Sequence, residues 1–345
     1  MLVQTYFPQQ LAPSRYDGYL ASGWFRGSVM LYKMDILCLD KDLFSVVNIR
    51  LNLQKHSMKK SLRKIERKGD ERFTISTGPA QPNPEKELLY LQHKEKFKGF
   101  IHPTLSDYLS SGFHQTVFDT REICVYDGDK LIAVSFFDRG EKALASLLGL
   151  YDPEYKSYSL GIYTMIKELR YGIQNGYKWY YPGYVLDRPS PFDYKLRLGE
   201  FEYYNNNRRW SKFENHDPSS TKSYLFRSKL NELAEMLNAK GRNFQEVLYP
   251  LFSMGYVGYW NAEFLKYPLF LELSGNKEEK TILSFDLDLN AYVVLKVIPA
   301  QNYDHLMNME TSQEFEEQDN YKMKLLMVSE QLCITPDKEG TLIKL

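Results

Sequence analysis

Cysteine is scarce in this chain of 345 residues, and its scarcity excludes several classes of protein. The three cysteines, Cys38, Cys124 and Cys333, lie far apart and form no paired spacing. Disulfide frameworks and cysteine metal sites both depend on recognisable cysteine spacings. We therefore expect no disulfide framework and no metal, and we interpret the three thiols as buried structural groups.

Long hydrophobic runs are also absent. No apolar stretch approaches the roughly 18 residues that a membrane-spanning helix needs. Residues 1–10 lack the basic and apolar regions of a signal peptide. From these two observations we expect a cytoplasmic location and no membrane partner.

A net charge is missing as well, because 44 Lys and Arg balance 44 Asp and Glu. The charges are unevenly distributed, however. Residues 1–214 hold 31 Lys and Arg against 25 Asp and Glu, whereas residues 215–345 hold 13 against 19. Since nucleic-acid binding depends on the charge of the domain that makes the contact, the front part is compatible with such a partner.

The stretch from Tyr151 to Lys195 carries the clearest structural signals. Ser159 to Gly161 predicts a helix start, where Ser can cap the helix and Gly lets a ligand approach the backbone. Asn175-Gly176 predicts the end of that helix. A strand at residues 177–181 and a break at Pro182 to Tyr184 should follow. The helix face predicted to be buried consists of Ile162, Ile166, Leu169 and Ile173.

The front part contains an aromatic loop and an unusual strand. Residues 16–28 predict a tight loop that carries Trp24 and Arg26. Either this loop binds a ligand, or Trp24 anchors the segment to the core. Residues 44–53 predict a strand that carries Arg50. An arginine in an apolar strand needs an internal carboxylate or an anionic ligand as its partner.

A dense run of cations follows between Lys55 and Lys68, with seven Lys and Arg against the single acid Glu66. Met58, Leu62 and Ile65 have helical spacing, which predicts a helix with one apolar stripe and a basic outer face. That face is either simply solvated or binds a phosphate backbone.

The order of elements then indicates a fold. Residues 76–84 predict a linker, and residues 85–97 and 106–112 predict helices. Strands are expected at residues 121–126, 130–137 and 143–150, with a hairpin turn at Asp127-Gly128. Together with the helix after Ser159 and the strand that follows it, this is the strand-strand-strand-helix-strand layout of an N-acetyltransferase-like fold, an α/β (α+β) class.

Several motifs resemble the arginyl-tRNA-protein transferases and their bacterial leucyl-transferring relatives, from about Tyr16 to Tyr204. That family has an Asp-Pro turn, a Ser-Leu-Gly helix start, a Leu-Gly-Tyr segment and a Met-x-Tyr-Lys segment in this order. It also has a Gly-Trp-Arg-Arg loop and an Arg-Ile strand before a basic helix. The corresponding segments here are Asp152-Pro153, Ser159 to Gly161, Pro182 to Tyr184, Asp193 to Lys195, Gly23 to Arg26 and Ile49 to Leu51.

The chain departs from the family in identifiable places. No cysteine cluster precedes Cys38, so the family's metal or iron-sulfur role is not carried over. Phe25 replaces a loop arginine, and Pro182 replaces the leucine of Leu-Gly-Tyr. Residues 215–345 have no counterpart that we recognise.

The resemblance implies that an amino acid, arginine or leucine, passes from an aminoacyl-tRNA to the α-amine of a protein N-terminus, without a cofactor. A neutral amine attacks an activated ester, so orientation and stabilisation of the oxyanion matter more than a strong base. The residues implied are Tyr184, Tyr194 and Lys195 for catalysis; Ser159, Leu160, Gly161 and Ile162 for the donor; Trp24, Arg26 and Arg50 for the acceptor; and Lys59, Lys60, Arg63 and Lys64 for tRNA.

Other interpretations of these residues and this fold stay open. Tyr184 and Tyr194 are two of 27 tyrosines and can serve packing, and Lys195 can be a solvated strand residue. Asp152 suits a turn, and Asp138 could orient an amine. An acyl-CoA-dependent N-acyltransferase with acetyl-CoA as donor is one alternative function, although the turn before Gly161 offers a single glycine. A non-catalytic tRNA- or protein-binding module is the other.

Three domains are predicted: residues 1–100 with the Gly-Trp loop and basic helix, residues 101–214 as the acyltransferase-like catalytic domain, and residues 215–345 as an accessory α+β domain. The first two are expected to form two acyltransferase-like units. In the tail, residues 221–237 and 243–252 predict helices, and residues 269–273, 280–287 and 291–298 predict strands. Residues 310–319 form an acidic segment. A partner or a homodimer through this domain is expected.

Overall fold

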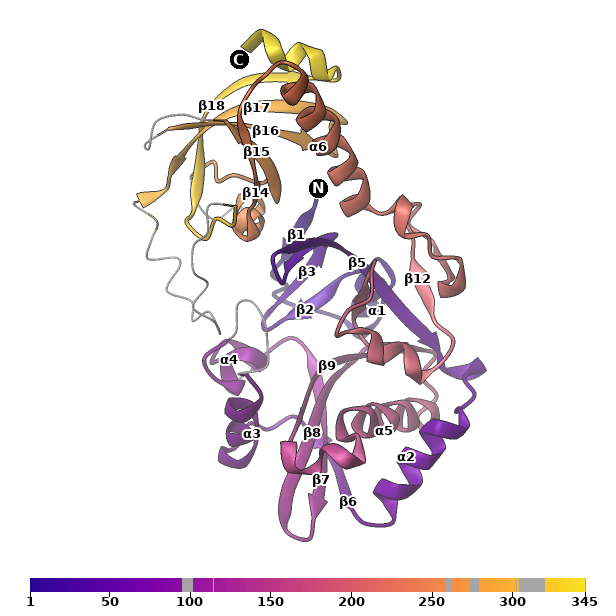
Figure 1. The fold of residues 1–345 in the computed structure, drawn as a ribbon. Coiled ribbons are helices and arrows are strands. Elements are labelled where there is room, and N and C mark those ends of the chain that lie inside the picture. Colours follow the sequence, from indigo (N-terminus) through magenta and orange to yellow (C-terminus); the bar gives the residue numbers. More distant parts are fainter. Residues whose placement is uncertain are drawn as a thin grey trace. The chain divides into compact units, whose positions relative to one another are not determined.

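The computed structural model describes residues 1–94, 102–113, 115–257, 262–273, 279–301, 303 and 320–344. These residues form two compact units, each assembled from separate stretches of the chain (Figure 1). Unit 1 consists of Met1–Thr5, Met34–Val46 and Asp217–Leu345, and unit 2 of Tyr6–Lys33 and Val47–His216. The three domain ranges expected from the sequence and the second acyltransferase-like unit stay predictions.

Unit 2 is built around one long mixed sheet. Strands β9 and β10 are parallel, and the other neighbours in the sheet order are antiparallel. A short strand, β11 (Tyr184–Leu186), pairs with β5 beside this path. The order is β13 (Trp210–Lys212), β12 (Glu202–Tyr204), β5 (Asp42–Asn52), β10 (Trp179–Tyr181), β9 (Ala143–Tyr151), β8 (Lys130–Arg139), β7 (Asp119–Asp127) and β6 (Thr74–Pro79).

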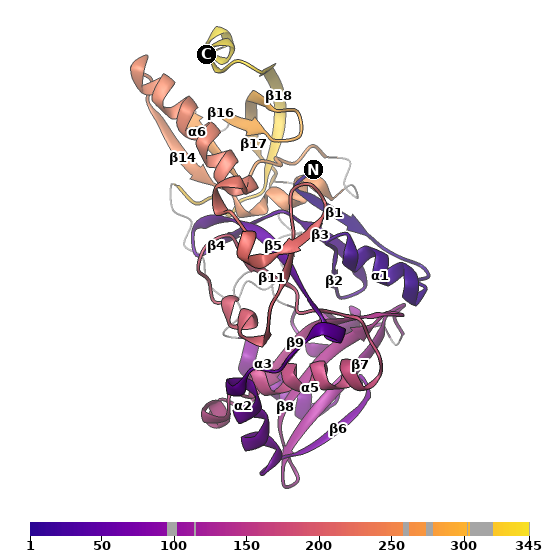
Figure 2. The same cartoon turned by 90° about the vertical axis from the view of Figure 1, so that its right-hand side faces the viewer.

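Helices cover both faces of this sheet. Ile123 and Val125 of β7 belong to the core beneath α5 (Leu160–Gln174), whereas Cys124 between them packs with α3 (Pro84–Lys94). Successive side chains of a strand point to opposite faces, so strands that are apolar on both faces need a helix layer on each side. A second helix, α2 (Lys60–Asp70), packs against α5 (Figure 2). Helix α4 (Leu105–Ser110) follows α3.

The order β7, β8, β9, α5, β10 confirms the N-acetyltransferase-like fold predicted from the sequence. Gly128 has a φ of 61° at the predicted hairpin turn, and Asn175 and Gly176 end α5 as predicted. One member of the predicted buried face was wrong. Ile173 is 39% exposed at the last turn of α5, and the buried face instead includes Met165, Glu168 and Gly172.

The front part of unit 2 is more regular than the sequence indicated. Helix α1 (Pro13–Ala21) occupies much of the segment predicted as a loop, and Gly23, with a φ of 80°, makes the turn out of it. Strands β2 (Phe25–Gly27) and β3 (Met30–Met34) then form a hairpin. Likewise, the linker predicted at residues 76–84 was wrong, because Thr74–Pro79 pairs with β7 as the edge strand β6.

Unit 1 contains a five-stranded antiparallel sheet and α6 (Lys222–Ala239), as predicted for residues 221–237. Residues 243–252 were predicted as a helix, which was wrong, because Phe244–Leu248 pairs with β15. β1 (Val3–Tyr6) begins in this unit, and β4 (Ile36–Leu39) pairs there with the start of β5. The sheet order is β14 (Phe244–Leu248), β15 (Leu269–Leu273), β16 (Lys280–Asp286), β17 (Ala291–Pro299) and β18 (Leu326–Thr335).

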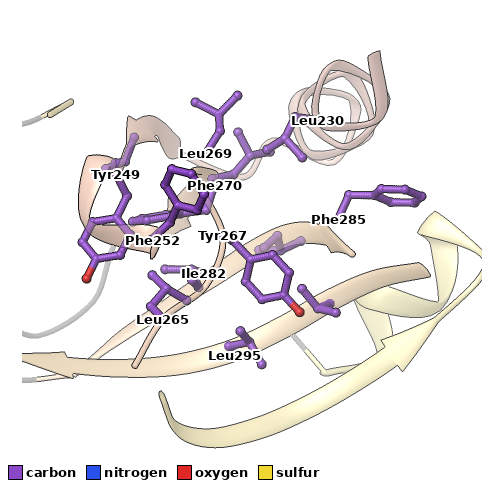
Figure 3. Close-up of a cluster of buried hydrophobic side chains, with 14 of the residues drawn as sticks. Leu230, Tyr249, Phe252, Leu265, Tyr267, Leu269, Phe270, Ile282, Phe285 and Leu295 are labelled. Carbon is purple, nitrogen blue, oxygen red and sulfur yellow. The ribbon is translucent and has the colours of Figure 1, made fainter. Parts of the chain in front are cut away.

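The core of unit 1 lies between α6 and this sheet. Figure 3 shows Leu230 of α6 together with Phe270, Ile282 and Leu295 from successive strands, and all four side chains are at most 3% exposed. The predicted strands at residues 269–273, 280–287 and 291–298 are confirmed as β15, β16 and β17. The acidic segment at residues 310–319 lies outside the described residues.

Candidate active site

The strands β9 and β10 separate within the sheet, and the candidate site surrounds that point. Their parallel pairing covers three positions and ends at Tyr181 opposite Ala145. Gly183, with a φ of 93°, then turns the chain so that it continues beside β5 as β11. Because β9 extends on to Tyr151, its second half runs on without β10 beside it. The start of α5 follows shortly after β9.

Ser159 has an unusual backbone at the start of α5. Its φ of 53° and ψ of 46° place it in the left-handed region, which is uncommon for a residue with a Cβ. Its side chain makes no capping hydrogen bond. The amides of Ile162 and Tyr163 both donate to the Ser159 carbonyl at 2.9 Å, so the predicted donor amide of Ile162 is used within the helix. The first-turn amides of Leu160 and Gly161 are those for which a helix provides no i−4 acceptor.

The structure brings part of the predicted donor and catalytic sets together. A Cβ built on Gly161 would lie 3.6 Å from the ring of Tyr151, the last residue of β9. Tyr194 lies in the turn Asp193–Leu198, which packs against α5. Burial and then the charges of Glu168 and Tyr151 raise the pKa of the Tyr194 hydroxyl. The Tyr194 side chain is nevertheless 44% exposed and can reach a ligand.

Lys195 lies in the short 3₁₀ turn Asp193–Leu198 rather than in a strand. Its ammonium donates to the carbonyl of Tyr184 at 3.0 Å and lies 5.2 Å from the Tyr184 ring and 5.1 Å from the Phe192 ring. Within the described ranges it has no ion-pair partner. Desolvation lowers the pKa of Lys195 to about 8, so the amine is still mostly charged at pH 7. Burial alone raises the pKa of Tyr184 to about 12.

Arg26 is buried in an ion pair with Asp138, with 2.5 Å between Nη1 and Oδ1. It also donates to Thr120 Oγ1 at 2.6 Å and to the carbonyls of Ser28 and Leu109. The hydroxyl of Tyr16 donates to the second oxygen of Asp138 at 3.1 Å. These contacts engage both charged groups inside the protein, which favours a structural role for Arg26 and Asp138.

Arg50 has an equally complete environment. Its guanidinium bonds Glu202 at 2.7 Å, and its Cζ lies 3.6 Å from the ring centroid of Trp179 and 4.2 Å from that of Trp210. Of the two partners considered from the sequence, the internal carboxylate is therefore the one present. Trp24 is partly buried against Tyr19, at 5.5 Å between ring centroids.

The four cations predicted to bind tRNA lie at the start of α2. Lys60, Arg63 and Lys64 are exposed on the helix, and Lys59 is the exposed residue before it. None of the four makes an ion pair in the part of the chain that the structure describes. A groove of about 1400 Å³ between α2, β6 and α5 is lined by Lys60, Arg63 and Lys64. Its other lining cations, Lys167 and Arg170, pair with the lining acids Glu66 and Asp70. The exposed cations at the start of α2 suit contact with an anionic polymer.

The turn role considered for Asp152 can also be placed. Asp152 accepts a hydrogen bond from the amide of Glu154 at 2.9 Å and pairs with Lys130 at 2.7 Å, as a turn residue would.

Among the described residues, no group of three His, Cys, Asp or Glu side chains comes together in a way that could hold a metal ion. Nor does any described helix have the length and apolarity to cross a membrane.

Sequence reasoning missed Glu168. It lies on α5, is 0% exposed, and accepts a hydrogen bond from Tyr180 at 2.7 Å. Desolvation raises the pKa of Glu168 to about 7. The helical spacing could have predicted this burial. Met165, three residues before Glu168, and Gly172, four residues after it, are buried on the same helix face.

The sheet topology, with a site where β9 and β10 separate, defines a protein of the N-acyltransferase fold class. Residues 85–205 match the family described as the C terminus of arginine-tRNA-protein transferase. This stretch is about a third of the chain, and its match agrees with the resemblance that the motifs carry.

Curated relatives carry the name aspartate/glutamate leucyltransferase. The protein of Leptospira interrogans is 25% identical over 195 residues, which cover 55% of this chain and 74% of that protein. The proteins of Helicobacter hepaticus and Vibrio cholerae are 25% and 23% identical, over 57% and 59% of this chain and 82% and 85% of their own lengths.

Among solved structures, L-PGS from Bacillus licheniformis is 13% identical with a TM-score of 0.33, over 55% of this chain and 54% of that one. A structure of FemX is 9% identical with a TM-score of 0.36, over 53% and 64%.

Proposed function

We propose that the chain transfers an amino acid, leucine or arginine, from the 3′ ester of an aminoacyl-tRNA to the α-amino group of a protein N-terminus. The observation that carries this proposal is the placement of Lys195, a cation without an ion-pair partner among the described residues, held by the Tyr184 carbonyl beside the Gly183 turn that follows β10. The family match and the relatives' names support the reaction type, and those names favour leucine and acidic N-termini.

Each part of the site has a role in the proposed chemistry. The amine attacks the ester carbonyl, and the developing oxyanion needs a donor that is already in position. Lys195 is the candidate donor, while Tyr184 and Tyr194 orient the ester and the leaving ribose oxygen. The amides of Leu160 and Gly161, with Ser159, hold the aminoacyl end. Because the donor ester is already activated, the reaction needs no cofactor.

The remaining predicted residues act at a distance from the chemistry. Lys59, Lys60, Arg63 and Lys64 bind tRNA phosphates along α2. Since Arg26 and Arg50 are engaged by Asp138 and Glu202, we propose that they shape the acceptor side by fixing β2 and β5. Trp24 belongs to the same hydrophobic cluster as Trp179 and Trp210, and we assign it the same role.

The test is transfer of labelled leucine and arginine from charged total tRNA to peptides that begin with Asp, Glu or Ala. We expect one of the two amino acids to appear on the Asp or Glu peptides, detected by mass spectrometry. A parallel assay supplies acetyl-CoA to the same peptides. Acetylation without any aminoacyl transfer would contradict the proposal, and tight tRNA binding without either transfer would favour a binding module.

A further inference from the structure

The groove between α2, β6 and the second half of α5 has a volume of about 1400 Å³, and the proposed function uses only the cations of α2 that line it. On the side of the sheet it is lined by Ile75 and Thr77 of β6 and by Ile123 of the neighbouring strand β7. Ile75 is 38% exposed. The groove therefore combines a basic helix with an uncharged, partly apolar edge of the sheet.

The outer edge of β6 is open to another strand. The strand order of the sheet ends at β6, which pairs with β7 alone in the part of the chain that the structure describes. Five of its six residues are exposed, and none of the six is charged. Edge strands are usually protected from further pairing by charged side chains, bulges or a covering element. An uncharged, exposed edge can accept an extended peptide through main-chain hydrogen bonds.

The charges of the groove select the kind of peptide. Six of the lining side chains are cationic and three are acidic. The three acids each lie within ion-pair distance of a lining cation. Lys60, Arg63 and Lys64 have no acidic partner within the described ranges, so the lining has a positive excess that acidic side chains would balance.

We propose that this groove binds an extended acidic segment of a partner protein, which adds as a strand beside β6. Main-chain hydrogen bonds to β6 hold the segment, and its acidic side chains meet Lys60, Arg63 and Lys64. The six residues of β6 span about 20 Å, so about six residues of the partner fit beside them. A nucleic acid fits less well, because it cannot pair with a strand edge and its phosphates would face the three acids.

The segment also has a regulatory consequence, which rests on the proposed function. The cations that it covers are those proposed to bind tRNA phosphates. A partner bound in the groove therefore competes with aminoacyl-tRNA and lowers the rate of transfer.

The first experiment measures binding of a fluorescein-labelled peptide of ten residues, in which Glu alternates with Val, to the full chain by fluorescence anisotropy. A matched peptide has Lys in place of Glu and should bind at least about 10-fold more weakly. Thr77→Glu puts a negative charge into the groove and should weaken binding of the acidic peptide about 10-fold. Thr74→Glu makes the same change on the opposite face of β6 and should leave binding unchanged. Equal effects of the two variants would overturn the inference.

The second experiment tests the pairing with β6. Two further acidic peptides carry N-methyl groups on alternate residues, one set in each register, so that each peptide loses the donors along one edge. One edge of an added strand faces β6 and the other faces solvent, so one register should weaken binding about 10-fold and the other should have little effect. Binding that is insensitive to both registers would exclude a strand beside β6.

The third experiment tests competition. The acidic peptide, at about ten times its Kd, should raise the apparent KM for charged tRNA about 10-fold and leave kcat unchanged. Displacement of labelled tRNA, followed by anisotropy, measures the same competition without turnover. Peptide binding without displacement would overturn the regulatory role. If the peptide does not bind but a ten-residue single-stranded oligouridylate does, and Thr77→Glu weakens that binding, the groove is a nucleic-acid site and the inference is wrong. Absence of transfer by the wild type, by contrast, would count against the proposed function and not against peptide binding.

Discussion

Lys195 shows how a single side chain can limit activity on the alkaline side. Its pKa of about 8 is lowered by desolvation, so the charged form is lost as pH rises through about 8. The acceptor α-amine, with an ordinary pKa near 7.7–8.0, gains reactivity over the same range. We therefore expect a bell-shaped profile of kcat/KM with its maximum between about pH 7 and 8.

Substitutions at Lys195 test whether this residue causes the fall of kcat/KM at alkaline pH, the alkaline limb of the profile. Lys195→Met should lower kcat/KM by about 100-fold, the usual effect of removing an oxyanion donor. Lys195→Arg keeps its charge at every accessible pH, so its residual activity should lack the alkaline limb. Lys142→Met, at an exposed lysine of unit 2, is the control and should leave the profile unchanged. An alkaline limb that persists in Lys195→Arg would rule out Lys195 as its source.

Ser159 provides a prediction about strain. The left-handed backbone costs a residue with a Cβ roughly 1 kcal/mol, which glycine avoids. Ser159→Gly should therefore be more stable than Ser159→Ala by roughly 0.5–1 kcal/mol in urea unfolding. Because the hydroxyl makes no capping bond, it is available to a donor, and both variants should transfer more slowly than the wild type. Equal stabilities of the two variants would show that the backbone relaxes at this position.

At the scale of elements, α2 carries the test of tRNA binding. Changing Lys59, Lys60, Arg63 and Lys64 to Ala removes four exposed cations, none of which is in an ion pair within the described ranges. If each meets a phosphate, tRNA binding should weaken and the slope of log K against log salt should fall by up to about 3–4. Filter binding or fluorescence anisotropy at several salt concentrations measures both effects.

The matched control changes four exposed cations elsewhere in unit 2: Lys142, Lys178, Arg209 and Lys212. It lowers the net charge equally and should leave the slope nearly unchanged. An equal fall in both variants would mean that α2 contributes only to the general field of the protein.

The elements also show what local pattern can predict. Helix α2 and strands β7 to β9 were found because their apolar residues repeat with the period of one regular structure. Strand β6 was missed because Thr74–Pro79 is an edge strand with mostly exposed residues and no apolar alternation. Phe244–Leu248 was taken for a helix because only its pairing with β15 makes it a strand.

The same limit applied to the site. The start and end of α5 and the position of Lys195 near Tyr184 follow the motif order. The partners of Arg26 and Arg50 could not be predicted, because Asp138 and Glu202 are 112 and 152 residues away in the sequence. Glu168 was missed because a glutamate without a charged partner is expected at the protein surface and not in the core.

At the scale of the whole molecule, the chain crosses between its two units more than once. Met34–Val46 belongs to unit 1 although the residues on either side belong to unit 2. Within unit 1, Ile36 and Leu43 are 0% exposed and pack in the same core as α6 and the five-stranded sheet. A domain boundary near residue 215 would therefore separate Met34–Val46 from the tail residues that share its core.

Truncation tests this consequence. A chain ending at His216 should expose Ile36 and Leu43, each of which loses about 1.5–3 kcal/mol of burial, and we expect low soluble yield and aggregation. Adding Ile36→Thr and Leu43→Thr, which keep strand propensity while removing the apolar surface, should recover soluble protein with the urea transition of unit 2. Soluble yield and urea unfolding followed by circular dichroism measure both effects. If the unmodified truncation is already soluble and unfolds cooperatively, Met34–Val46 does not depend on the tail for its burial.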